Sequence, residues 1–198
     1  MTDETKKEAR RTSPSADLAE EEPVFEGEEH IFEGRVVDLW VQDYCFPHGV
    51  RSRLELVRHP GGAAVVALDG QGRVAFVKQY RHATTGWLME IPAGKLERGE
   101  SPVACVTREI EEEIGFQAET FDSLGWMWSA PGFSNEKIWL FLARDLKAGS
   151  QSLDPDEWLT VTWRDFGEAI ADALEGRITD AKSVVGLLRA KRVLEGET

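Results

Sequence analysis

Residues 94–116 read GKLERGESPVACVTREIEEEIGF, and this stretch decides the fold. It predicts a helix that begins after Ser101, because serine is a good N-cap and Pro102 suits the first helical position. Gly115 follows the pattern, as is usual for a residue just past a helix end. Branched apolar residues recur at spacings of three and four and are expected to form one buried face: Val103, Val106, Ile110 and Ile114.

A second stripe of this helix is made of glutamates. Glu109, Glu112 and Glu113 share one face, because residues three and four apart are neighbours on a helix, and we expect them to face solvent before metal binds. Their mutual repulsion would become attraction around a divalent cation, and Mg²⁺ commonly bridges carboxylates to substrate phosphates. Arg108 lies beside the stripe and is expected to orient one of the glutamates. Taken alone, the stripe also suits a solvated acidic helix face.

The residues around the glutamates decide between these two interpretations. The stretch resembles the Nudix box, the signature of a family of hydrolases, and departs from it at no position. The matching residues are Gly94, Glu100, Arg108, Glu109, Glu112, Glu113 and Gly115. The resemblance implies a Nudix fold, an α/β fold with a mixed β-sheet sandwiched between α-helices, here with an additional N-terminal β region. It also implies an enzyme that cleaves the pyrophosphate of a nucleoside diphosphate linked to another group.

Composition divides the chain of 198 residues into three parts. Residues 1–22 are polar, charged and poor in aromatic residues, which predicts a disordered acidic tail. Residues 23–60 are expected to form the N-terminal β region, which the resemblance assigns to dimerisation and substrate binding. Residues 61–198 are expected to form the Nudix hydrolase domain.

Hydrophobic patterns place the individual elements. Two β-rich runs at 62–68 and 73–79 flank a glycine-containing turn, which predicts a hairpin. Strands interleaved with few helices indicate a mixed sheet between helical layers. Other strands are expected at 34–41, 54–58, 121–128, 137–143 and 158–163. Helices are expected at 102–114, 164–174 and 179–194.

Charge and cysteine content exclude several classes of protein. The formal net charge is −13, and an acidic protein is repelled by nucleic acid, so no nucleic-acid partner is expected. No apolar run is long enough to span a membrane, and the N-terminus lacks the apolar segment of a secretory signal. Cys45 and Cys105 do not have a metal-binding spacing and are expected to be reduced thiols of a cytoplasmic protein.

The resemblance covers most of residues 30–190 and points to the ADP-ribose pyrophosphatase branch of the family. It rests on RHPG at 58–61, QYR at 79–81, MEIPAG at 89–94 and SAPGFSNE at 129–136. Relatives that act on GDP-mannose and other nucleotide sugars share several of these motifs. The predicted reaction is therefore hydrolysis of ADP-ribose to AMP and ribose 5-phosphate. The alternatives are another nucleotide sugar such as GDP-mannose or ADP-glucose, a dinucleotide, or a non-catalytic ligand sensor with the same fold.

The same resemblance implies the roles of individual residues. Mg²⁺, or Mn²⁺ in its place, would be held by Glu109 and Glu113, with assistance from Glu112 and the carbonyl of Ala93. Arg108 would orient the glutamates. The implied substrate-binding residues are Arg81, Glu90 and Phe133. For Arg81, which would bind the phosphates, a surface salt bridge is the alternative interpretation.

The catalytic base is expected outside the box, on the acidic loop 153–158. Glu157 aligns best, with Asp154 and Asp156 as substitutes, Glu112 as the next candidate, and a plain acidic turn as the alternative. Trp40, Phe133 and Trp158 are candidates to stack on the base or cover the site, although aromatic residues more often pack in a core or at an edge. Isolated histidines such as His59 are interpreted as structural or surface residues. A homodimer is expected because similar pyrophosphatases form one.

Overall fold

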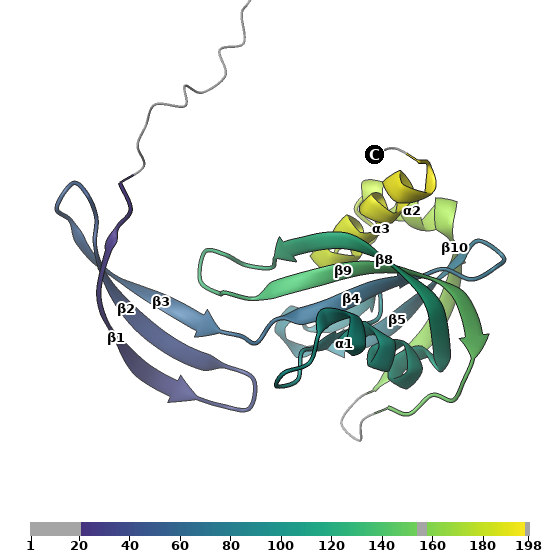
Figure 1. The fold of residues 1–198 in the computed structure, drawn as a ribbon, viewed down its shortest axis with the longest axis horizontal. Helices are drawn as coiled ribbons and strands as arrows, with labels where there is room; N and C mark the ends of the chain where they lie inside the picture. Colours follow the sequence, from purple (N-terminus) through teal and green to yellow (C-terminus); the bar gives the residue numbers. More distant parts are fainter. Residues whose placement is uncertain (1–20, 154–157, 197–198) are drawn as a thin grey trace, which may run out of the picture.

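The structure is a computed structural model that describes residues 21–153 and 158–196. The strands are β1 (Val24–Glu33), β2 (Asp38–Cys45), β3 (Arg51–Arg58), β4 (Gly62–Ala67), β5 (Arg73–Arg81), β6 (Gly86–Glu90), β7 (Ala93–Lys95), β8 (Phe116–Trp128), β9 (Lys137–Ala148) and β10 (Leu159–Asp165). The helices are the 3₁₀ turn η1 (His82–Thr84), α1 (Pro102–Glu109), the π-helical turn η2 (Ile110–Ile114), α2 (Phe166–Leu174) and α3 (Ala181–Leu194). Figure 1 shows how these elements are arranged.

Strand β4 lies at the centre of the core and is buried along its whole length. It pairs in parallel with β9 and antiparallel with β7, in a sheet of order β7-β4-β9-β8. Alternate residues of β4 face opposite layers, as the pleat of a strand requires. Ala64 and Val66 pack with α2 and α3, whereas Ala63 and Val65 pack with α1. The predicted mixed α/β fold, with helices on both sides of the sheet, is therefore confirmed (Figure 1).

The predicted hairpin of residues 62–68 and 73–79 is wrong. Both strands exist, but β4 and β5 belong to different sheets and pair only beside the turn, through an isolated bridge between Leu68 and Val74 and a hydrogen bond from the Asp69 N–H to the Arg73 carbonyl at 2.9 Å. Strand β5 instead pairs with β6 and β10. The two strands diverge beyond the turn because each has other partners along its length: β9 and β7 for β4, and β10 and β6 for β5.

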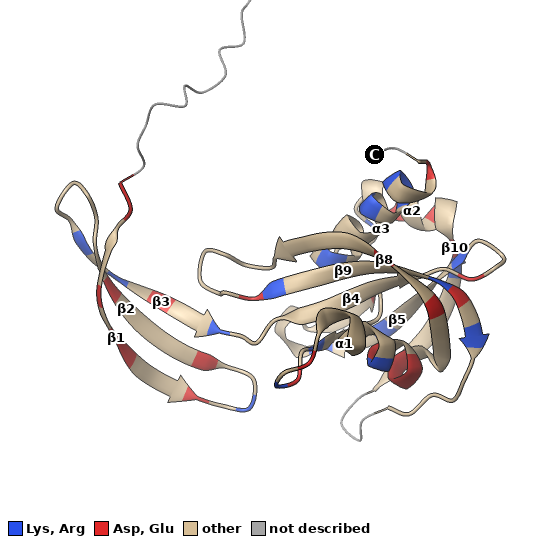
Figure 2. Cartoon of the chain, in the orientation of Figure 1, with Lys and Arg blue, Asp and Glu red and all other residues tan. Residues whose placement is uncertain are grey.

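The N-terminal strands form a separate antiparallel sheet of order β1-β2-β3, which projects from the core in Figure 1. The strand expected at 34–41 is displaced, because residues 34–37 form the turn between β1 and β2, in which the N–H of Gly34 donates to the Val37 carbonyl at 2.8 Å. Arginines of β3 form ion pairs with acidic residues of β1, whose strand is marked red in Figure 2, and Arg51 pairs with Glu26 at 2.9 Å. These ion pairs are exposed and contribute little to stability, and no residue of β1, β2 or β3 belongs to the buried hydrophobic clusters of the described chain.

The box helix begins as predicted, with the Ser101 hydroxyl accepting from the N–H of Ala104 at 3.3 Å. It ends as predicted at Gly115, which has a left-handed φ of 71°. The predicted burial of Val103 is wrong, because this residue is 43% exposed. Cys105 is buried on the apolar face instead. The helix widens into a π-helical turn at η2, and a π turn shifts the residues that share a face.

Helix α3 closes the other side of the molecule and is fixed to the end of β6. The backbone N–H of Ile91 donates to the Ser183 hydroxyl at 2.8 Å, and Ser183 is completely buried. Gly186 lets α3 approach closely, because a Cβ there would meet Ile91 at 2.9 Å. Within the residues described, no helix is long and apolar enough to cross a membrane.

Candidate active site

Arg108 donates hydrogen bonds to three carboxylates of the box. Its Nη1 donates to Glu109 at 2.7 Å and to Glu112 at 2.8 Å, and its Nε donates to Glu100 at 3.1 Å. The hydrogen bond from Arg108 is the main reason that the pKa of Glu100 is lowered. The predicted orienting role of Arg108 thus has a geometric basis, and it extends to three carboxylates rather than one.

Two of the box glutamates, Glu109 and Glu113, are buried, contrary to the expectation that they face solvent. Glu109 is 6% exposed and Glu113 is 2% exposed. The reason is β7, which lies against the helix and brings its backbone to the carboxylates. The N–H of Ala93 donates to Glu113 at 3.0 Å. Gly94 is required at the next position, because a Cβ there would lie 1.5 Å from Oε1 of Glu109.

The chemistry of these donors suits a hard cation such as Mg²⁺. They are carboxylate oxygens beside the backbone of Ala93, and hard cations prefer oxygen ligands. In the described part of the chain no three ligand side chains converge on one point, since Glu109 and Glu112 share Arg108. Burial, chiefly, raises the pKa of the neighbouring Cys105 to about 12, so this thiol stays protonated and offers no thiolate ligand.

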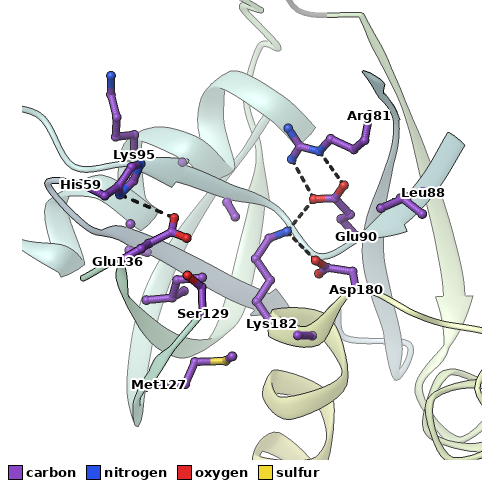
Figure 3. Close-up of a pocket in the computed structure, with 16 residues that line it drawn as sticks. His59, Arg81, Leu88, Glu90, Lys95, Met127, Ser129, Glu136, Asp180 and Lys182 are labelled. Carbon is purple, nitrogen blue, oxygen red and sulfur yellow. Dashed lines mark hydrogen bonds and ion pairs between the residues drawn. The ribbon is translucent and has the colours of Figure 1, made fainter. Parts of the chain in front are cut away.

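Across β7 from the box, an open pocket of about 430 Å³ contains a second charged cluster (Figure 3). Arg81 binds Glu90 through two parallel hydrogen bonds, each 2.7 Å long. Lys182, the second residue of α3, also donates to Glu90. Burial alone would raise the pKa of Glu90, but the bonds from Arg81 and the charge of Lys182 outweigh it and lower that pKa to about 2. Glu90 is therefore a buried carboxylate that is ionised at neutral pH.

The opposite wall of the same pocket comes from the start of β4 and from the β8–β9 loop. It includes His59, Ser129 and Glu136. The His59 ring accepts from the N–H of Gly61 at 3.1 Å through Nδ1, and this atom lies 3.5 Å from Glu136. His59 thus supports the loop, in keeping with its interpretation as a structural residue.

The structure brings together most of the residues predicted for the site. Arg81, Glu90 and Ala93 line the pocket. Phe133 does not, because it is 57% exposed on the β8–β9 loop and lines a separate groove against the N-terminal sheet. The loop's own hydrogen bonds explain this position, since the Phe133 carbonyl accepts from the N–H of Val57 at 2.7 Å.

The three candidate aromatic residues are also separated. Trp40 stacks on His30 with ring centroids 4.6 Å apart, within the N-terminal sheet. Trp158 packs edge-on against Trp87, with ring centroids 4.9 Å apart. Neither Trp40 nor Trp158 lines the pocket. The proposed base Glu157, with Asp154 and Asp156, lies outside the described residues, so the assignment of the base stays a prediction.

Sequence reasoning missed Lys182 and Asp180. Both line the pocket from α3, and Lys182 lies 3.1 Å from Asp180. The signal that could have found them is a lysine in the first turn of a helix that begins with a capping Asp180, because the helix dipole disfavours a cation at that end. The partner carboxylate, Glu90, is 92 positions away and could not be paired from spacing.

Comparison with known proteins identifies a NUDIX domain over residues 58–185. The chain is similar to the methanol dehydrogenase activator of Bacillus methanolicus, with 41% identity over 161 residues, 80% of this chain and 87% of that protein. It is 36% identical to the ADP-ribose pyrophosphatase of Bacillus subtilis strain 168 over 173 residues, 85% of this chain and 94% of that protein. A crystal structure of an ADP compounds hydrolase has a TM-score of 0.79 and 24% identity, covering 89% of this chain and 96% of that one, which supports the fold alone.

The chain therefore belongs to the Nudix family. It is a Nudix pyrophosphohydrolase, an enzyme that hydrolyses a diphosphate-linked nucleotide.

Proposed function

We propose that the enzyme hydrolyses ADP-ribose to AMP and ribose 5-phosphate and depends on Mg²⁺, with Mn²⁺ able to replace it. One observation carries the proposal. The box carboxylates and the Arg81–Glu90 pair both adjoin β7, because Ala93 donates its N–H to Glu113 and lines the pocket together with Arg81 and Glu90. A diphosphate lying along β7 would therefore meet a cation site and a guanidinium together. The similarity to an ADP-ribose pyrophosphatase over nearly its whole length supports the choice of substrate.

In this proposal the protein's own residues bind and orient the diphosphate. Arg81 donates to phosphate oxygens from the edge of the guanidinium that does not face Glu90. Glu109, Glu113 and Glu112 would hold the cation, which would screen the negative charge and make water more acidic. A water oxygen forms the new P–O bond as the bridging P–O bond breaks, and its proton goes to a base that we propose to be Glu157.

A substrate panel tests the proposal. The full chain is assayed with ADP-ribose, GDP-mannose, ADP-glucose, NADH and dinucleoside polyphosphates, with products identified by chromatography. We expect kcat/KM for ADP-ribose to exceed the next substrate by about tenfold or more, a ratio that hydrogen-bonding sites reach readily. EDTA should abolish turnover and Mg²⁺ should restore it. A higher kcat/KM for any other substrate, or turnover in EDTA, would contradict the proposal.

We also propose that two copies associate through the N-terminal sheet. Large apolar side chains are exposed at both ends of β1, where a partner surface could bury them. The exposed large apolar residues of β1 are Val24, Phe25, Ile31 and Phe32. The net charge of −13 argues against a nucleic-acid partner.

A further inference from the structure

The carboxylate of Glu90 is held by two cations that come from different parts of the fold. Arg81 at the end of β5 binds both of its oxygens, and Lys182 in the first turn of α3 binds Oε2 (Figure 3). Glu90 is 2% exposed, so water does not compete effectively for these bonds. The orientation of the Arg81 guanidinium is consequently set by the position of a buried carboxylate that Lys182 also holds.

Lys182 is itself fixed in place. Its side chain is only 12% exposed, and Nζ also donates to Asp180 at 3.1 Å. Asp180 caps α3 by accepting from the N–H of Ser183 at 3.0 Å. Ser183 in turn accepts from the N–H of Ile91, next to Glu90 in the chain. The first turn of α3 and the end of β6 are therefore one rigid unit, with the ammonium group at its pocket face.

Charge gives this unit a consequence for substrate binding. A bidentate pair such as Arg81–Glu90 is neutral as a whole, and the carboxylate repels an approaching phosphate as strongly as the guanidinium attracts it at equal distance. Lys182 supplies the second positive charge at Glu90. The helix N-terminus offsets part of the charge of Asp180, since a capping aspartate lies at the positive end of the helix dipole.

We propose that Lys182 is a positioning residue for diphosphate binding, which acts through Glu90 to keep Arg81 oriented and its charge available to the substrate. This proposal rests on the proposed function, because it takes Arg81 as the phosphate-binding residue. It adds the first turn of α3 to the site. Without the ammonium group, Glu90 would be neutralised by Arg81 alone, and binding of the diphosphate would weaken while the chemical step would change little.

The test compares Lys182→Met with Lys182→Arg and with a matched control, Lys191→Met. Lys191 lies on the same helix, is 45% exposed and pairs only on the surface, with Glu195 at 3.2 Å. Steady-state rates with ADP-ribose give KM and kcat, and titration calorimetry gives the Kd of inorganic pyrophosphate. For Lys182→Met we expect KM and Kd to rise about tenfold, which is typical for the loss of a charge-assisted bond, with kcat within about threefold. Lys182→Arg should stay within about threefold of wild type, and Lys191→Met should not differ from it.

A double-mutant cycle with Glu90→Gln separates a positioning role from direct contact. In the Glu90→Gln background there is no carboxylate for Lys182 to hold, so adding Lys182→Met should change Kd for pyrophosphate by less than about twofold. In the double variant neither the Glu90 carboxylate nor the Lys182 ammonium group is present, so no buried charge loses its partner at this pair. The double variant should therefore fold even if one of the single variants does not. An equal tenfold effect in both backgrounds would overturn the proposal in favour of direct contact with the substrate.

Other outcomes are equally decisive. An unchanged Kd in Lys182→Met, with only a lower melting temperature, would show a purely structural lysine and overturn the proposal. A fall in kcat at constant KM would overturn it as well. Failure of the wild-type enzyme to hydrolyse ADP-ribose would refute the proposed substrate, whereas the pyrophosphate Kd values would still decide the role of Lys182.

Discussion

Glu109 and Glu113 are one helical turn apart, carry like charge and are both buried. Burying a carboxylate is costly unless it is paired or hydrogen-bonded, and each has such a group: Arg108 for Glu109 and the Ala93 N–H for Glu113. The spacing in the sequence identified these residues as a group. Their burial could not be predicted from it, because β7 covers them only after it pairs with β4.

At the scale of single residues, Glu113→Gln tests the proposed metal site. We expect kcat to fall at least about 10²-fold, because charge stabilisation by a metal contributes several kcal/mol. The melting temperature without metal should stay within about 2 °C or rise slightly, since one like-charge pair is removed. Any rise in melting temperature that Mg²⁺ gives the wild type should be lost. The matched control is Glu111→Gln, an exposed glutamate of the same turn that bonds Gln117 at 3.1 Å. Near-normal turnover by Glu113→Gln would contradict the assignment.

At the scale of elements, the short strand β7 joins the two halves of the site. It pairs with β4, lines the pocket and covers the box helix. Gly94 lies against the Glu109 carboxylate of the box helix. The absence of a side chain at this position therefore matters more than the backbone freedom of glycine. Any side chain there must displace the Glu109 carboxylate, and the proposed metal site with it.

Gly94→Ala therefore should lower both activity and stability. We expect kcat to fall by at least about tenfold and the free energy of unfolding by about 1–3 kcal/mol, the usual cost of overpacking a tight site. Gly70→Ala is the matched control, because a Cβ at Gly70 would meet no atom within 4 Å. Activity assays and thermal unfolding check both variants. If Gly94→Ala and Gly70→Ala had the same kcat and the same melting temperature, Glu109 could move aside without loss of function, and the prediction would be wrong.

Elements with strong local signals could be predicted from the sequence, and those defined by distant pairing could not. The box helix, β5, α2 and α3 have clear periodicity or caps, and all were expected near their observed bounds. Strands β6 and β7 were missed, because they are short and their partners lie on β5 and β4. The same limit applies to the site. The box carboxylates are close in sequence, whereas Lys182 reaches Glu90 only because α3 packs against the end of β6.

At the scale of the whole molecule, the N-terminal sheet buries few of its side chains within one chain. Its strands pair well with one another, but most residues of β1 are exposed. In Figure 1 the sheet stands apart from the core, to which it is linked by β3 and by an isolated bridge between Val57 and Ser134. Exposed apolar side chains are stabilised by burial against another surface, and we propose that a second copy of the chain supplies that surface.

Light scattering at micromolar concentration should therefore give about twice the chain mass of 22.2 kDa. Phe32→Asp should shift the protein towards the monomer, because Phe32 is 56% exposed on β1 and a buried, unpaired aspartate would oppose association. Val193→Asp is the matched control, since Val193 is an exposed apolar residue on α3, at the opposite end of the molecule in Figure 1. It should leave the dimer intact, and circular dichroism should show that both variants are folded. A wild-type mass near 22.2 kDa would refute the dimer, and a dimeric Phe32→Asp protein would place the interface elsewhere.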